Sequence, residues 1–173
     1  MKLKQINLNY QAGQDRILLR VSTHSGLEYQ AWLTRRIVQR LVPALDQLYE
    51  LDTVQQAPDA QSRAAVREFR QSNALQQANF KPEYEADGLA PGHEGEPLLV
   101  YHVRLRRLEA GQYLLVLSPE AGDGLQLRFN EVLLHATRKL LIDTQQRAGW
   151  GLFDTPPVTT PETAASVAAE RLN

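Results

Sequence analysis

Two segments of this chain alternate apolar and polar residues and then pass directly into a helical pattern. The stretch GLEYQAWLTRR begins at Gly26, and a similar stretch, GLQLRFNE, begins at Gly124. Alternation with a period of two is typical of a half-buried strand, whereas apolar residues three and four positions apart are typical of a helix. A strand that leads into a helix twice in one chain indicates a layered α+β fold.

In the first segment, residues 1–52, three strands precede a helix. The apolar side chains alternate over three runs, residues 3–10, 16–23 and 27–33. Thr34 can accept a hydrogen bond from an unpaired amide at the start of the helix that follows. Pro43 lacks an N–H group, so we expect either a kink in this helix or two short helices.

The second segment, residues 97–150, has the same order of elements. Three alternating runs predict strands at residues 99–106, 113–117 and 125–129. Asn130 is a suitable N-cap for the next helix, and Gly149 followed by Trp150 fits its C-terminal end. We expect one face of this helix to be buried against the sheet, with Leu133, Leu140 and Leu141 on it.

Residues 55–79 predict a peripheral helix with a narrow buried stripe that includes Ala65 and Phe69. The next stretch, residues 81–97, is rich in Pro, Gly and acidic residues. Such a composition has too few apolar groups to offset the entropy of ordering, so we expect a mobile acidic loop.

These patterns predict an α+β fold in which antiparallel sheet packs on two main helices. Two βββα pseudo-repeats, about 1–52 and 97–150, are joined by the peripheral helix and the acidic loop. A three-stranded sheet with one helix leaves its other face and both edges uncovered, and a second copy of the unit can cover them. We therefore expect a single domain over residues 1–150 and an extended tail over 151–173.

The composition excludes several classes of site. The 173 residues include no Cys, which excludes disulfides, thiolate zinc sites and iron–sulfur clusters. The four His residues have no metal-ligand spacing, and neither a Gly-rich phosphate loop nor a nucleophile motif is present. We predict no metal, no cofactor and no catalytic residue. Without an apolar stretch of the length of a signal peptide or membrane span, we expect a cytoplasmic protein.

A few side chains could form a binding surface. Trp32 has the opposite parity to its apolar neighbours, so it is an exposed interface anchor or stacking platform. The alternative is that it belongs to a second core layer or is turned inward by a local bulge. The basic residues on the polar parity of their strands are Arg20, His102, Arg104, Arg106 and Arg128. If these strands adjoin, they form a basic stripe that can bind phosphates. The alternative is a solvated face neutralised by Glu28 and Glu109.

These features favour a non-catalytic binding or assembly protein that associates with itself or with another protein, and not with a membrane. The alternative is a protein that binds single-stranded nucleic acid on the basic stripe. Tandem units of sheet and helix resemble the arrangement in PUR-alpha and whirly-type domains, in which curved sheets carry single strands. The net charge of −1 gives no global attraction to nucleic acid, so a local basic face is required. An enzyme whose site is assembled from distant residues is a third hypothesis.

Overall fold

The computed structural model describes residues 3–56, 60–78, 84–109 and 111–153, without the side chains of 51–56, 60 and 61. Over these residues the fold is α+β, as predicted, with three α-helices and two sheets in which antiparallel pairing dominates. Apart from residues 151–153, the expected tail lies outside the described residues.

The first sheet, sheet A, is built on two consecutive hairpins. Its antiparallel strands are β1 (Leu3–Gln11), β2 (Arg16–Thr23) and β3 (Leu27–Leu33), and two short strands, β4 (Ala90–Pro91) and β5 (Leu98–Leu99), run parallel to β3. The register places Leu8 opposite Leu19, and Leu19 opposite Ala31. All three side chains are buried, so this parity forms the inner face of sheet A.

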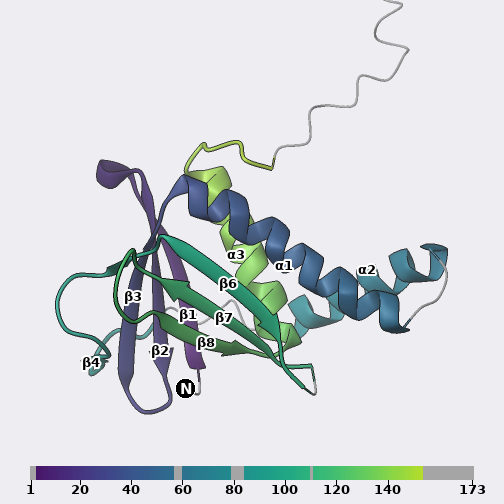
Figure 1. Ribbon diagram of the computed structural model, residues 1–173, viewed down its shortest axis with the longest axis horizontal. Coiled ribbons are helices and arrows are strands. Elements are labelled where there is room, and N and C mark those ends of the chain that lie inside the picture. Colours follow the sequence, from purple (N-terminus) through teal and green to yellow (C-terminus); the bar gives the residue numbers. More distant parts are fainter. Residues whose placement is uncertain (1–2, 57–59, 79–83, 110, 154–173) are drawn as a thin grey trace, which may run out of the picture.

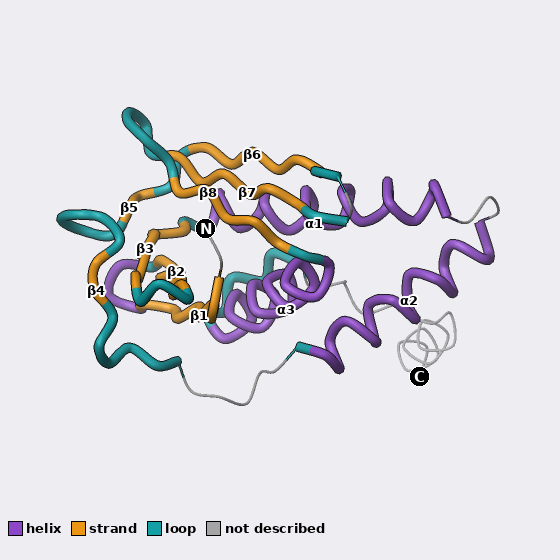
Figure 2. Tube along the Cα trace, turned by 90° about the horizontal axis from the view of Figure 1, so that it is seen from below, coloured by secondary structure: helices purple, strands orange, loops and turns teal. Residues whose placement is uncertain are grey.

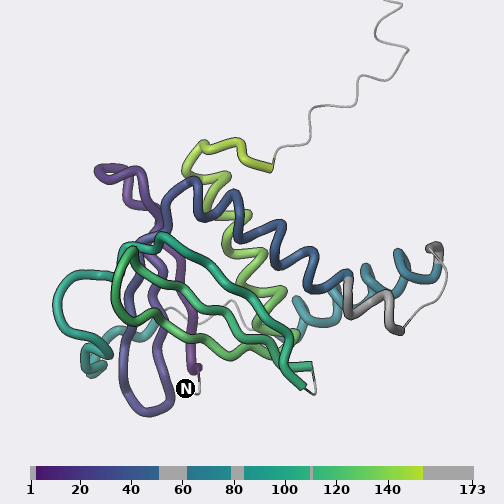
Figure 3. The backbone as a smooth tube through the Cα atoms, viewed as in Figure 1, coloured from purple at the N-terminus to yellow at the C-terminus, as the bar shows by residue number. Residues whose placement is uncertain are grey.

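The second sheet, sheet B, is a three-stranded antiparallel meander. Its strands are β6 (His102–Arg107), β7 (Tyr113–Ser118) and β8 (Leu125–Phe129). Leu105, Leu115 and Leu127 lie in one row of its inner face. The chain passes from β5 into β6 at one corner, where the Val100 amide donates to the Trp32 carbonyl oxygen and the Tyr101 amide donates to that of Ser118. The tube in Figure 3 follows this passage from sheet A into sheet B.

Two of the three helices pack against the sheet that they do not follow in the chain. The helices are α1 (Arg35–Gln56), α2 (Ala60–Gln77) and α3 (Glu131–Arg147). Helix α1 comes directly after β3 but contacts β6, and α3 comes after β8 but makes more extensive contact with β1 (Figures 1 and 2). Buried apolar residues of both sheets, α1 and α3 therefore form one cluster.

The predicted helix ends are confirmed. The Thr34 hydroxyl accepts from the Ile37 amide at 3.4 Å, and the Asn130 side-chain oxygen accepts from the Leu133 amide at 2.9 Å. Gly149 has a φ of +67°, the left-handed conformation that ends many helices, and the Trp150 side chain that follows it is buried.

Of the two effects predicted for Pro43, a division into two short helices is not found, because α1 continues through this residue as a single helix; the kink stays a prediction. Proline removes one N–H group, but its neighbours Leu41, Val42 and Leu45 are all buried. The packing of these side chains outweighs the loss of one hydrogen bond on the solvent side of the helix.

The buried face of α3 is rotated from the predicted one. Leu141 is fully buried as expected, but Leu133 and Leu140 are only half-buried, and Leu134 is buried in their place. The reason is that α3 contacts α1 and α2 as well as β1, so that more than one side of the helix is covered.

One expectation for the connecting segment is corrected, and another stays a prediction. On the described part of α2, Ala65 and Phe69 are exposed, and Ala74 is buried. The described part of the acidic loop contacts sheet A at several points, and its mobility stays a prediction. Its Glu85 pairs with Lys4, β4 pairs with β3, and a Cβ at Gly92 would lie 2.5 Å from the Tyr29 ring. Composition alone does not reveal such specific contacts.

The turn between β1 and β2 is joined to the far end of the described chain. Asp15, at a φ of 47°, accepts hydrogen bonds from the Trp150 indole at 2.7 Å and from the Tyr10 hydroxyl at 2.9 Å. These bonds, with Arg35 nearby, hold the pKa of Asp15 below its ordinary value. We call this arrangement the Asp15 joint.

Leu141→Ala is expected to lower the free energy of unfolding by about 2–5 kcal/mol, because it removes a fully buried side chain and leaves a cavity. Phe69→Ala is the control, since that ring is 72% exposed and its loss should change stability by no more than about 0.5 kcal/mol. Urea denaturation measures both. Equal stability of the two variants would contradict the assigned face of α3.

Candidate functional site

The outer face of sheet B brings together four of the six predicted binding residues. His102, Arg104 and Arg106 project from β6, and all three are exposed. Arg106 lies opposite Leu114, which in turn lies opposite Arg128 of β8. Because cross-strand partners project from the same side of a sheet, these side chains share one face. We call His102, Arg104, Arg106 and Arg128 the basic face.

The basic face is not neutralised by carboxylates of its own sheet. Strands β6, β7 and β8 contain no Asp or Glu. Arg104, Arg106 and Arg128 form no ion pair with any residue that the structure describes, whereas other arginines, such as Arg67 with Glu50, do. Figure 2 shows no described helix on the outer side of this sheet. Three guanidinium groups therefore face solvent together.

Glu109, expected as one of the neutralising residues, lies at one end of this surface. It lines a cavity with Arg107 and Arg128 beside the turn between β6 and β7. Arg104 and Arg106 do not line that cavity. Any neutralisation by Glu109 is therefore confined to the Arg128 end of the basic face.

Arg20 does not belong to the basic face, because it lies in sheet A. Its guanidinium is 2.8 Å from the Glu28 carboxylate and 4.5 Å from the centre of the Tyr84 ring. Burial raises the pKa of Glu28, but the hydrogen bond from Gln30, the nearby Tyr84 hydroxyl and the charge of Arg20 outweigh this and hold it below its ordinary value. The stripe expected to cross all the strands is thus limited to sheet B.

Trp32 lies on the outer parity of sheet A, as its sequence position indicated. It is partly exposed, and it is opposite Leu18 on β2 and Leu99 on β5. We call these three residues the Trp32 row. Sheet A therefore presents an apolar row where sheet B presents cations.

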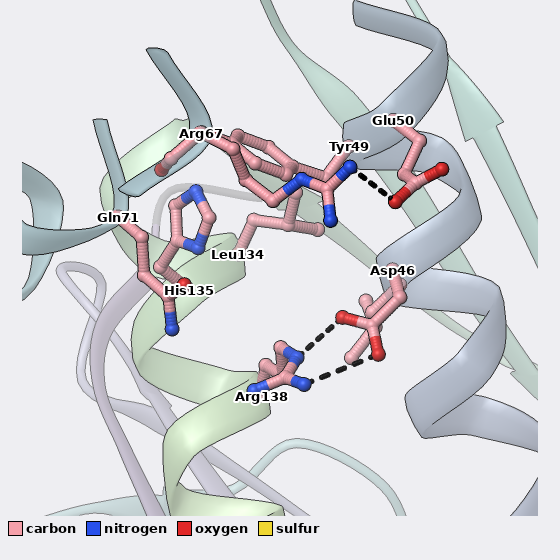
Figure 4. A pocket seen from close by; sticks show the side chains of 9 residues that line it. Asp46, Tyr49, Glu50, Arg67, Gln71, Leu134, His135 and Arg138 are labelled. Atoms are coloured by element: carbon pink, nitrogen blue, oxygen red, sulfur yellow. Dashed lines mark hydrogen bonds and ion pairs between the residues drawn. The ribbon is translucent and has the colours of Figure 1, made fainter. Parts of the chain in front are cut away.

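A second candidate site, which the sequence analysis missed, lies where the three helices meet (Figure 4). The cavity has a volume of about 270 Å³ and is lined by Leu45, Asp46, Tyr49, Glu50, Arg67, Gln71, Leu134, His135 and Arg138. Asp46 and Glu50 are four residues apart, as are Glu131 and His135, so each pair lies on one side of its helix. That spacing is the sequence signal from which these residues could have been found.

Ion pairs join the three helices two by two around this cavity. Two guanidinium nitrogens of Arg138 on α3, Nε and Nη2, donate to the Asp46 carboxylate on α1. Arg67 on α2 pairs with Glu50 on α1 at 2.6 Å. The third pair, Arg70 on α2 with Glu131 on α3 at 2.7 Å, completes the set.

His135 lies beside these pairs and is 95% buried. Its ring is 4.4 Å from the Tyr49 ring in a T-shaped arrangement, and its Nε2 has no hydrogen-bond partner among the described residues. Burial and the nearby Arg70 and Arg138 lower the pKa of His135, and the carboxylates of Glu131 and Asp46 oppose this only in part. The imidazole is therefore neutral near pH 7.

The chemistry of this cavity is that of a polar helix junction. The Tyr49 hydroxyl donates to the Arg67 carbonyl oxygen, and Asp46 and Glu50 are held by arginines. No hydrogen bond joins a nucleophile to a base among the lining side chains that the structure describes, as covalent catalysis would need. Within the same described ranges, no three His, Asp or Glu side chains are grouped so that they could hold a metal ion.

Comparisons with known proteins do not identify a family for this chain. No protein-family model matches the chain, and no curated protein or solved structure is significantly similar to it. None of the described helices combines the length and the apolarity needed to cross a lipid bilayer.

The lowered pKa of His135 makes stability depend on pH. The unfolded chain takes up a proton near the ordinary pKa of about 6.5, and the folded chain does so only at lower pH. Stability should therefore be complete above about pH 6.5 and fall as the pH drops from there toward the folded pKa. His135→Phe should flatten this part of the profile, whereas the exposed His102→Gln should not. Urea midpoints at several pH values test this, and a slope unchanged in His135→Phe would contradict it.

Proposed function

We propose that this chain is a non-catalytic binding protein that holds single-stranded nucleic acid on the basic face of sheet B. The observation that carries the proposal is the group of three exposed arginines without a carboxylate partner among the described residues. Guanidinium groups bind phosphate oxygens with two parallel hydrogen bonds, and the release of counterions from the nucleic acid drives such binding. A local basic face can act in this way although the whole chain is nearly neutral.

The shape and composition of the face favour a single strand over a duplex. Val116, which is partly exposed, lies between Arg104 of β6 and Gln126 of β8, so an exposed base can contact an apolar side chain there. Arginine planes also stack on unpaired bases. Reading a duplex usually requires a helix or a two-stranded ribbon placed in a groove, and a broad three-stranded face does not enter one.

The two stretches of three strands and one helix are proposed to be copies of one βββα unit. The order of elements and the crossed packing of α1 and α3 support this. Under this proposal the two outer faces have diverged, because sheet B carries the basic face and sheet A carries the Trp32 row.

Replacing Arg104, Arg106 and Arg128 with Gln should weaken binding of a labelled single-stranded oligonucleotide about tenfold per substitution at low salt. The dependence of log affinity on log salt should also become shallower by about 0.7 for each phosphate contact that is lost. Fluorescence anisotropy at several salt concentrations measures both quantities.

Arg67→Gln is the matched control, because it removes one exposed arginine on α2 away from sheet B. It should leave both the affinity and the salt dependence unchanged. If the control and the basic-face variants lost affinity equally, the effect would come from net charge alone, and this would contradict the proposal. Binding of an acidic peptide but not of the oligonucleotide would show that the anionic partner is a protein.

Self-association is the second candidate function, and the Trp32 row favours it. A partly exposed tryptophan between two leucines is the kind of anchor that contributes most when a partner removes it from water. Because the row lies on sheet A and the basic face on sheet B, the two functions do not compete for the same residues.

Trp32→Ala should shift the chain toward the monomer while leaving it folded, and it should not alter the salt dependence of oligonucleotide binding. Sedimentation velocity at several protein concentrations measures the first effect, and anisotropy the second. Phe69→Ala removes a more exposed aromatic side chain outside the row and serves as the control. If the wild type is a monomer at all concentrations, the self-association proposal is wrong.

A further inference from the structure

We propose that a cleft between α1 and β6 holds one base of the bound strand, and this inference rests on the proposed function. The cleft has a volume of about 230 Å³ and lies between Ile37, Arg40 and Ala44 of α1 and residues 101–105 of the chain. In Figure 1, α1 runs beside β6, which is an edge strand of sheet B. The cleft thus lies at the free margin of the sheet that carries the basic face.

The walls of the cleft match the chemistry of a nucleobase. Ile37, Val103 and Leu105 provide apolar contacts, and Tyr101 provides a partly exposed aromatic ring. Unpaired bases are held by stacking on such rings. The cleft is smaller than the roughly 300–1,000 Å³ typical of sites for drug-sized ligands, so one planar ring system fits it better than a larger group.

The charges around the cleft match the phosphate backbone of the bound nucleic-acid strand. Arg40 and Arg104 both line it, and no Asp or Glu does. Neither arginine has an ion-pair partner in the part of the chain that the structure describes. A base between the apolar walls would therefore have a guanidinium group on each side for its flanking phosphates.

Arg104 connects the cleft to the basic face, because it belongs to both. A nucleic-acid strand bound on the outer face of sheet B would cross the edge strand β6. There it would meet Arg104 first and then Tyr101 and Arg40. The three-helix cavity offers no such path, because Asp46 and Glu50 line it and already pair with its two arginines. The cleft is the better site because its cations have no carboxylate partner within the described ranges.

Two variants of the full chain test the cleft without touching the basic face. Tyr101→Leu removes the aromatic ring, and Ala44→Leu narrows the cleft with a residue that also favours helix. The probe is a single-stranded oligonucleotide that carries the fluorescent base 2-aminopurine, whose emission falls when it stacks. Circular dichroism melts confirm that each variant is folded, and Phe69→Leu is the control for loss of an aromatic side chain elsewhere.

The wild type should quench the 2-aminopurine emission. Tyr101→Leu should remove this quenching and weaken binding about 5- to 150-fold, the range that corresponds to one stacked base. Ala44→Leu should weaken binding in the same direction. In both variants the salt dependence should stay as in the wild type, because no phosphate contact is lost, whereas Arg40→Gln should make it shallower by about 0.7.

The failure of this inference is distinguishable from the failure of the proposed function. If both folded cleft variants bind and quench like the wild type while the basic-face variants lose affinity, the base site is wrong and the proposed function stands. If the wild type binds no oligonucleotide at any salt concentration, both proposals are overturned.

Discussion

The crossed packing of α1 and α3 is the constraint on which the rest of the structure depends. A small sheet with one apolar face needs a cover, and in this chain each sheet is covered in large part by the helix that belongs to the other half. Because of this exchange, Leu41 and Leu45 of α1 and Leu141 of α3 enter one common core. It also leaves the outer side of sheet B without any of the described helices, and that side carries the basic face (Figure 2).

The arginines on the outer faces of the two sheets differ in their ion pairing. On sheet A, Arg20 is paired with Glu28 and lies against Tyr84, so its charge is satisfied within the protein. On sheet B, Arg104 and Arg106 follow the same strand alternation but have no such partners in the described ranges. An unpaired cation in water costs little, and it keeps its full attraction for an anion that arrives from outside. The two faces therefore differ in whether their arginines are paired within the protein.

Local sequence patterns predicted the helices and strands well. The burial and grouping of side chains were predicted less well, because they depend on long-range packing. Strand alternation and the caps at Thr34 and Asn130 depend on neighbours in the chain, so they could be recognised from sequence. The burial of Leu134 instead of Leu133 depends on α1 and α2, which approach α3 only in the folded molecule. For the same reason the basic residues of sheet B could be listed, but the separation of Arg20 and the cleft beside Tyr101 could not be foreseen. His135 was missed because its partners come from three helices.

The Asp15 joint gives the molecule a spectroscopic probe of its own folding. The bond from the Trp150 indole to Asp15 spans 135 residues, so it can form only after the last helix has reached the first hairpin. Trp32, by contrast, lies on β3, in the second hairpin, and is placed by its neighbours on β2. The chain has two tryptophans, and they therefore report different stages of refolding. Fluorescence of Trp32 follows the assembly of sheet A, and fluorescence of Trp150 follows the docking of the C-terminal end of α3 on the β1–β2 turn.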